Sequence, residues 1–140
     1  MKALTVQQPW AECIAVGAKL VENRSRPLSY RGPLAIHAGL RWSDRGARDD
    51  LVVRTLIGPD ALGPLTKPVA HDFGIHCGLV LAVGQLVDCH PAAGCCKPWG
   101  EESYDGKLVH HLVLEEIRRI EPVPASGRLG LWDVTLAGEE

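Results

Sequence analysis

The sequence lacks a long hydrophobic run, and this absence excludes a membrane-spanning protein. No apolar stretch among its 140 residues approaches the length of a transmembrane helix. The N-terminus also lacks the apolar region and the small-residue cleavage site of a signal peptide. We therefore expect a soluble, cytoplasmic protein that does not contact membranes.

An even, regularly spaced set of cysteines is also missing. The five cysteines are an odd number and are unevenly spread: Cys13, Cys77, Cys89, Cys95 and Cys96. Without a secretion signal, such a set argues against a disulfide framework and favours reduced thiols.

Segment 71–96 is rich in histidine and cysteine, which raises the possibility of a zinc site. However, it contains no C-x-x-C or H-x-x-x-H pair. The adjacent Cys95 and Cys96 would also struggle to place both sulfurs on one tetrahedral ion. We therefore predict no metal site and no other cofactor, with these thiols simply buried or in loops.

The chain has no excess of positive charge, which argues against a protein that coats duplex DNA. Its net charge is −2, but the two parts differ: residues 1–54 carry +4 and residues 55–140 carry −6. An anionic ligand is therefore expected to approach the N-terminal part.

The length and the 46% hydrophobic content predict a single domain, residues 1–140, with a real core. Residues 108–120 fit a buried strand, although Glu115 and Arg119 would also pair in a helix. We choose the strand. The pattern then predicts helices at 9–17 and 43–57, and strands at 2–6, 20–24, 34–38, 78–89, 108–120 and 131–136. This arrangement favours an α+β fold, a small, mostly antiparallel β-barrel of five or six strands with peripheral helices.

A charged cluster occurs where the first helix ends and the next strand begins. Strand alternation places Glu22 and Arg24 on one face, and Lys19 stands in the turn before them. Such a cluster can hold a phosphate or carbonyl while its carboxylate accepts from an amino or hydroxyl group. By spacing alone, a surface salt bridge is the simpler interpretation.

Four blocks of sequence resemble the ASCH domain family. Gly17, Lys19, Glu22 and Arg24 match its signature G-x-K-x-x-E-x-R. The other matching blocks are Gln8-Pro9-Trp10-Ala11, 30–38 with the strand 78–88, and 122–127 with 130–132. The resemblance covers most of the chain and implies a PUA-like barrel.

The resemblance also implies a function, namely binding of RNA or a modified nucleoside in a cleft lined by Lys19, Glu22 and Arg24. The residues expected beside this cleft are Gln8, Trp10, Tyr30, Arg31 and His37. Trp42, Trp99 and Tyr104 could stack on bases at its rim, whereas Arg41, Arg45, Arg48 and Arg54 fit a solvated helix face. A domain that binds protein partners is a further alternative.

Enzymatic activity stays open at this point. Some members of the family are ribonucleases, and a shorter branch hydrolyses N4-acetylcytidine with a lysine and a threonine three residues later. Here that position is Glu22, which leaves no hydroxyl nucleophile for that chemistry. A hydrolase could instead use Glu22 to activate water beside Lys19, or His37 as the base, although a lone histidine on a strand is more often structural.

Overall fold

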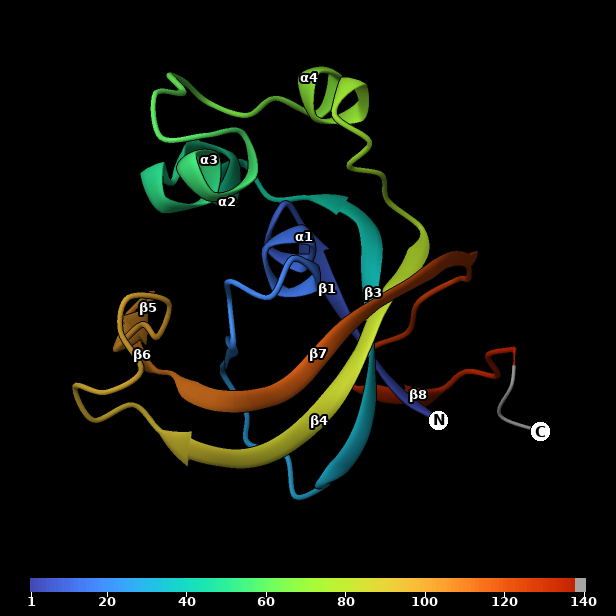
Figure 1. The fold of residues 1–140 in the computed structure, drawn as a ribbon. Helices are drawn as coiled ribbons and strands as arrows, with labels where there is room; N and C mark the ends of the chain where they lie inside the picture. Colours follow the sequence, from blue (N-terminus) through green and yellow to red (C-terminus); the bar gives the residue numbers. More distant parts are fainter. Residues whose placement is uncertain (138–140) are drawn as a thin grey trace.

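Six strands of the computed structural model form one sheet that curls around the first helix (Figure 1). The structure describes residues 1–137, so the end of the expected 1–140 domain lies outside the described residues. The strand order is β2-β7-β4-β3-β1-β8, and neighbours are antiparallel except for the parallel pair β1 and β3. The strands are β1 (Lys2–Gln8), β2 (Val21–Arg24), β3 (Gly32–Trp42), β4 (Leu79–Pro91), β7 (His110–Pro124) and β8 (Leu131–Asp133). The fold is therefore α+β with a mixed sheet.

The predicted closed barrel is wrong. Within residues 1–137, β2 and β8 are the two edges of the sheet and do not pair with each other. Both edges are short, and β8 pairs with β1 only over Lys2–Leu4. At the next residue the carbonyl of Thr5 accepts a hydrogen bond of 2.6 Å from Arg24 Nη2. A charged side chain thus spans the gap that backbone pairing would close in a barrel.

Helix α1 (Trp10–Ala15) fills the concave side of the sheet. It follows Pro9 and ends before Gly17, whose φ of +85° lies in the left-handed region that glycine readily adopts. The helix packs against four strands through the buried side chains of Ala11, Ile14 and Ala15. The main core joins these residues to Leu4, Val6, Leu34, Ile36, Ala38, Leu81, Ala82, Leu86, Leu112 and Leu114.

The helix predicted at 43–57 is two helices, α2 (Asp44–Arg48) and α3 (Asp50–Leu56). Ser43 caps α2 as expected by accepting from the amide of Gly46. Asp49 has an extended backbone, which ends α2, and its side chain caps α3. Another short helix, α4 (Lys67–Asp72), lies in residues 59–77, where the glycines and prolines of the sequence predict mostly loop with at most one short helical turn.

The C-terminal part of the chain contains the long antiparallel pair of β4 and β7. Its register shifts at three places, one of them at Gly84. The strand predicted at 108–120 is β7, which begins at His110 and extends to Pro124. The connection between β4 and β7 carries a separate hairpin, β5 (Ser103–Tyr104) with β6 (Lys107–Leu108). No helix within residues 1–137 has the length and apolar character needed to cross a membrane.

Candidate ligand pocket

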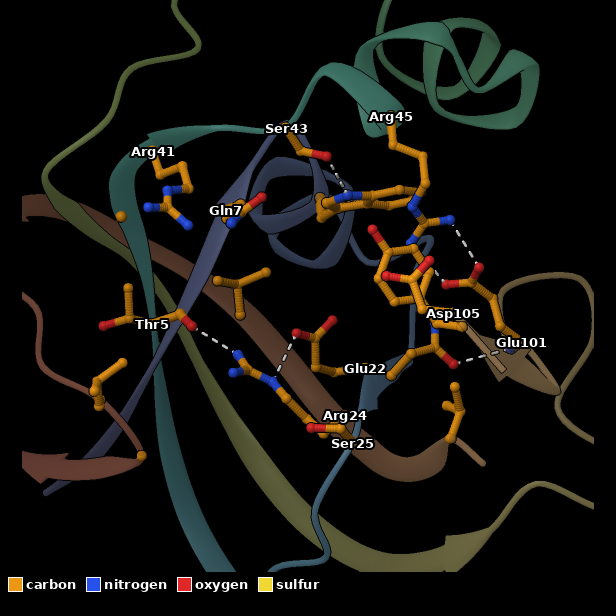
Figure 2. A pocket seen from close by; sticks show the side chains of 18 of the residues that line it. Thr5, Gln7, Glu22, Arg24, Ser25, Arg41, Ser43, Arg45, Glu101 and Asp105 are labelled. Atoms are coloured by element: carbon orange, nitrogen blue, oxygen red, sulfur yellow. Dashed lines mark hydrogen bonds and ion pairs between the residues drawn. The ribbon is translucent and has the colours of Figure 1, made fainter. Parts of the chain in front are cut away.

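A pocket of about 800 Å³ opens where the sheet fails to close (Figure 2). β1 and β2 supply its two sides, and the end of β3, the turn before α2 and the β5–β6 hairpin complete it. Residues 128–130, just before β8, lie at its margin. The pocket therefore collects side chains from segments that are far apart in the sequence.

Three charged side chains stand at one end of this pocket. Lys19 Nζ lies 2.9 Å from Glu22 Oε1, and Arg24 Nε lies 3.0 Å from Glu22 Oε2. The arrangement follows from the alternation of β2, which turns Glu22 and Arg24 to the same face. The carboxylate of Glu22 thus forms ion pairs with two cations, of which Arg24 is partly exposed to solvent and Lys19 is buried.

Lys19 lies at the bottom of the cluster and is only 1% exposed. Besides Glu22, its ammonium donates to the carbonyl of Val21 at 2.6 Å and lies 5.7 Å from the ring of Trp10. Glu22 itself is 8% exposed. The cluster is therefore not the surface salt bridge that spacing alone suggests, and Lys19 acts mainly by holding Glu22 in place.

Burial alone would raise the pKa of Glu22, because the charged form loses water. The charges of Lys19 and Arg24, with hydrogen bonds from Lys19 and the Asn23 backbone, outweigh this effect and lower the pKa below its usual value. Glu22 is therefore an anion at neutral pH. A carboxylate in this state accepts hydrogen bonds and donates none.

Arg45 forms the opposite wall with two aromatic rings. Its guanidinium lies 5.3 Å from the ring centroid of Trp10 and 4.8 Å from that of Tyr104. It also forms a two-point ion pair with Glu101, at 2.7 and 3.0 Å. Trp10 is fixed by a 3.0 Å hydrogen bond from its indole to Ser43. A planar cation thus stacks between two rings that face the pocket.

Four predicted site residues lie outside the residues that line this pocket. The amide of Gln8 is buried between the carbonyl of His76 and the amide of Glu12. Tyr30 and Arg31 bond to carbonyls of their own turn. His37 is buried, with its ring nitrogens at 3.1 Å from Thr5 Oγ1 and 2.7 Å from the Ala125 carbonyl.

The structure also brings in residues that the sequence analysis did not assign to the site. Arg45 was expected on a solvated helix face, and Glu101 was not considered. The pocket lining holds six basic residues, Lys19, Arg24, Arg41, Arg45, Lys107 and Arg128, against three acidic ones, Glu22, Glu101 and Asp105. The only sequence signal for this excess was the positive charge of residues 1–54.

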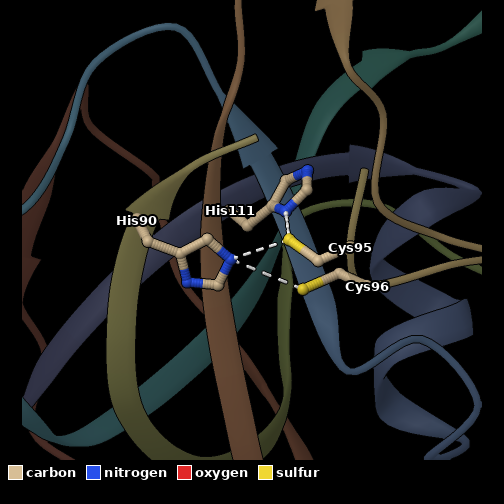
Figure 3. Close-up of side chains that lie close together, drawn as sticks. All are labelled: His90, Cys95, Cys96 and His111. Atoms are coloured by element: carbon tan, nitrogen blue, oxygen red, sulfur yellow. Dashed lines mark hydrogen bonds between the residues drawn. The ribbon is translucent and has the colours of Figure 1, made fainter. Parts of the chain in front are cut away.

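A second group of reactive side chains lies away from the pocket, where β4 ends and β7 begins (Figure 3). His90, Cys95, Cys96 and His111 place their donor atoms within 4.8 Å of one another. A backbone hydrogen bond from Ala93 and contacts with the two imidazoles lower the pKa of Cys95 to about 6. These four are the residues within 1–137 whose donor atoms gather as a metal site requires.

Comparison with solved structures identifies the fold. The ASCH protein of Zymomonas mobilis superposes with a TM-score of 0.55, at 14% identity, over 96% of this chain and 87% of its own. A point mutant of a Zymomonas mobilis ASCH protein has a TM-score of 0.49 at 16% identity, over 88% of this chain and 74% of its own. No family model and no curated protein matches the sequence. The predicted resemblance to the ASCH domain family is thus confirmed at the level of the fold.

Proposed function

We propose that this protein binds RNA or a nucleoside in the pocket at the open edge of the sheet. The observation that carries the proposal is the buried Lys19–Glu22–Arg24 cluster, an anion and a cation held in fixed positions beside empty space. Polar groups placed in this way recognise a ligand that has both donors and acceptors, as the edge of a nucleobase has.

Arg24 and Glu22 supply complementary contacts for a ligand. Arg24 Nη2 donates to the Thr5 carbonyl, and Nε lies 3.0 Å from Glu22 Oε2 as an ion pair without hydrogen-bond geometry. Among the described residues Nη1 has no partner. Nη1 can therefore donate to a carbonyl or phosphate oxygen, while Glu22 accepts from an amino or hydroxyl group.

The opposite wall fits the remainder of a nucleotide. Trp10 and Tyr104 offer aromatic faces on which a base can stack, and the basic excess of the lining attracts a phosphate. A volume of about 800 Å³ suits a nucleoside or a single-stranded nucleotide rather than a duplex. Arg45 stacks on both rings in the free protein, so a stacked base would move it.

The geometry favours binding over catalysis. Both oxygens of Glu22 contact cations, and a carboxylate with a lowered pKa is a weak general base. Glu22 also stands where the acetylcytidine hydrolases have their nucleophilic threonine. A protein-interaction domain would be favoured if the protein's own side chains filled the cleft, but they leave it open.

Binding to modified and unmodified nucleosides and to short single-stranded RNAs, measured by calorimetry and fluorescence anisotropy, tests the proposal. Arg24→Ala removes a charged donor, which should weaken binding by about tenfold or more. Arg54→Ala, an exposed arginine of α3 outside the pocket, is the matched control and should bind normally. Equal affinity in wild type and Arg24→Ala would refute the pocket assignment, and product formation seen by chromatography would favour a hydrolase instead.

A further inference from the structure

The four side chains at the end of the β4–β7 pair have the composition of a tetrahedral metal site. Two imidazoles and two thiols are a ligand set that zinc prefers. We propose that His90, Cys95, Cys96 and His111 bind one zinc ion and that this ion holds the loop that forms one wall of the pocket. The proposal is independent of the nucleoside-binding function.

The distances between the donor atoms agree with this geometry. With Zn–S of about 2.3 Å and Zn–N of about 2.0–2.1 Å, tetrahedral angles place sulfur and nitrogen about 3.6 Å apart. His90 Nε2 lies 3.3 Å from Cys95 Sγ and 3.6 Å from Cys96 Sγ (Figure 3). His111 Nδ1 lies 3.6 Å from Cys95 Sγ. An ion can therefore contact all four atoms with little movement of the chain.

The outer nitrogen of each imidazole has a fixed acceptor. His111 Nε2 lies 2.7 Å from the carbonyl of Glu101, and a carbonyl can only accept, so this nitrogen carries the hydrogen. His90 Nδ1 lies 2.8 Å from the carboxylate of Asp88. Both rings consequently turn a lone pair toward the thiols. Carboxylates and carbonyls hold zinc-bound histidines in the same way.

The backbone explains how two adjacent cysteines reach one point, which the sequence analysis considered difficult. Cys96 has a φ of 65°, a left-handed conformation that turns the chain sharply after Cys95. The two histidines lie directly opposite each other on the paired strands β4 and β7. His111 was absent from the sequence-based set, because it lies beyond segment 71–96 and becomes a neighbour only through this pairing.

Close packing holds the loop against the cluster. A Cβ atom on Gly100 would lie 2.8 Å from the Cβ and carbonyl oxygen of Cys96 and 2.9 Å from the His111 ring. One residue later, Glu101 accepts from His111 and pairs with Arg45 in the pocket wall. Asn23 fixes the same stretch through the carbonyl of Trp99 and the amide of Glu101.

With four protein ligands, the ion would have no open position for substrate, which marks a structural site. Its role would be to order the chain between β4 and β7. That chain supplies Glu101 and the β5–β6 hairpin to the pocket.

The test is to purify untagged protein with reductant, dialyse it against zinc and measure metal by mass spectrometry. We expect one zinc per chain in the wild type and in Cys77→Ser, whose half-buried thiol lies outside the cluster. The double variant Cys95→Ser/Cys96→Ser should bind no stoichiometric zinc. A wild type without stoichiometric zinc would overturn the proposal, as would equal zinc in the double variant.

Cobalt titration of the metal-free wild type gives a second measurement that does not depend on a variant folding. Tetrahedral coordination by two thiolates predicts strong visible absorption and a thiolate-to-cobalt band that saturate at one equivalent and disappear when zinc is added. His90→Gln should weaken this binding by at least tenfold, whereas His71→Gln, outside the cluster, should not. Weak octahedral absorption in the wild type would contradict the site.

Discussion

Lys19 is the residue on which the polar end of the pocket depends. It is among the largest fully buried side chains, and its charge is balanced by Glu22 and the Val21 carbonyl. A buried cation of this kind tolerates substitution poorly, because the partner left behind stays in a water-poor place. Lys19 therefore supports the site by holding Glu22 in place, and it is itself one of the residues that line the pocket.

Lys19→Met tests this dependence. The change leaves Glu22 with one cation and the Val21 carbonyl without its donor, so we expect a loss of about 3 kcal/mol in the free energy of unfolding. Urea denaturation measures it. Lys67→Met, an exposed lysine at the start of α4, should change the same quantity by less than about 0.5 kcal/mol. Similar losses of unfolding free energy in both variants would show that the buried Lys19–Glu22 pair does not contribute more to stability than an exposed lysine.

Glu22 should make the stability depend on pH in the acid range. Its folded-state pKa is lowered from 4.5, so its charged form contributes stability above about pH 4.5, and that contribution is lost as the pH falls through the lower folded pKa. Glu22→Gln should be less stable than wild type at neutral pH, and the difference should shrink on acidification. Urea midpoints across this range measure it, and a constant difference would contradict the assignment.

At the residue scale, the sequence predicted the cluster because its members lie within six positions of one another. Strand alternation was enough to bring Glu22 and Arg24 together, and the helix before them placed Trp10 nearby. Tyr104 was expected at the rim only because an aromatic ring can stack on a base. Arg45 and Glu101 were not assigned to the site. Their contacts depend on how distant segments meet in three dimensions, which no local pattern encodes.

At the scale of elements, Asp49 decides that one predicted helix becomes two. Its extended backbone ends α2, and its carboxylate accepts from the amides of Leu51 and Val52. The helical spacing of apolar residues, which predicted one continuous helix, continues past Asp49 without interruption. The pattern of apolar residues indicates which face of a helix packs against the core, whereas the capping residue determines where the second helix begins.

Asp49→Ala should cost about 1 kcal/mol of stability, because two amides of the first turn of α3 lose their acceptor. Thermal unfolding by circular dichroism measures this as a lower Tm. Asp60→Ala, an exposed aspartate in a turn, is the control and should leave the Tm nearly unchanged. A wild-type Tm in Asp49→Ala would mean that the packing of Val52 and Val53 stabilises α3 without a contribution from the cap.

For the whole molecule, the six strands of the main sheet were predicted at approximately the right positions, whereas the β5–β6 hairpin was not predicted and the expected closure into a barrel was wrong. Glycine bends and the alternation of apolar and polar residues indicate where single strands lie. Closure of the sheet depends instead on whether its two edge strands are long enough to pair. Here β2 and β8 have four and three residues. The predicted excess of positive charge in the first part of the chain agrees with the basic lining of the pocket.

Under the proposed function, the mixed charge of the molecule predicts a weak response of RNA binding to salt. A pocket that takes one or two phosphates should give a slope of log affinity against log salt between about −0.7 and −1.4. Anisotropy titrations with a short single-stranded RNA at several salt concentrations measure it. A slope of about −4 or steeper would mean that RNA follows a much longer path over the surface.

The hydrogen bond from Arg24 to Thr5 links the two sides of the open sheet. A ligand that binds Arg24 would therefore strengthen the connection between β1 and β2, and β2 is an edge strand with only one backbone neighbour. Occupancy of the pocket would then be visible as slower amide hydrogen exchange along Val21–Arg24 and along the second half of β1, the two strands that flank the pocket.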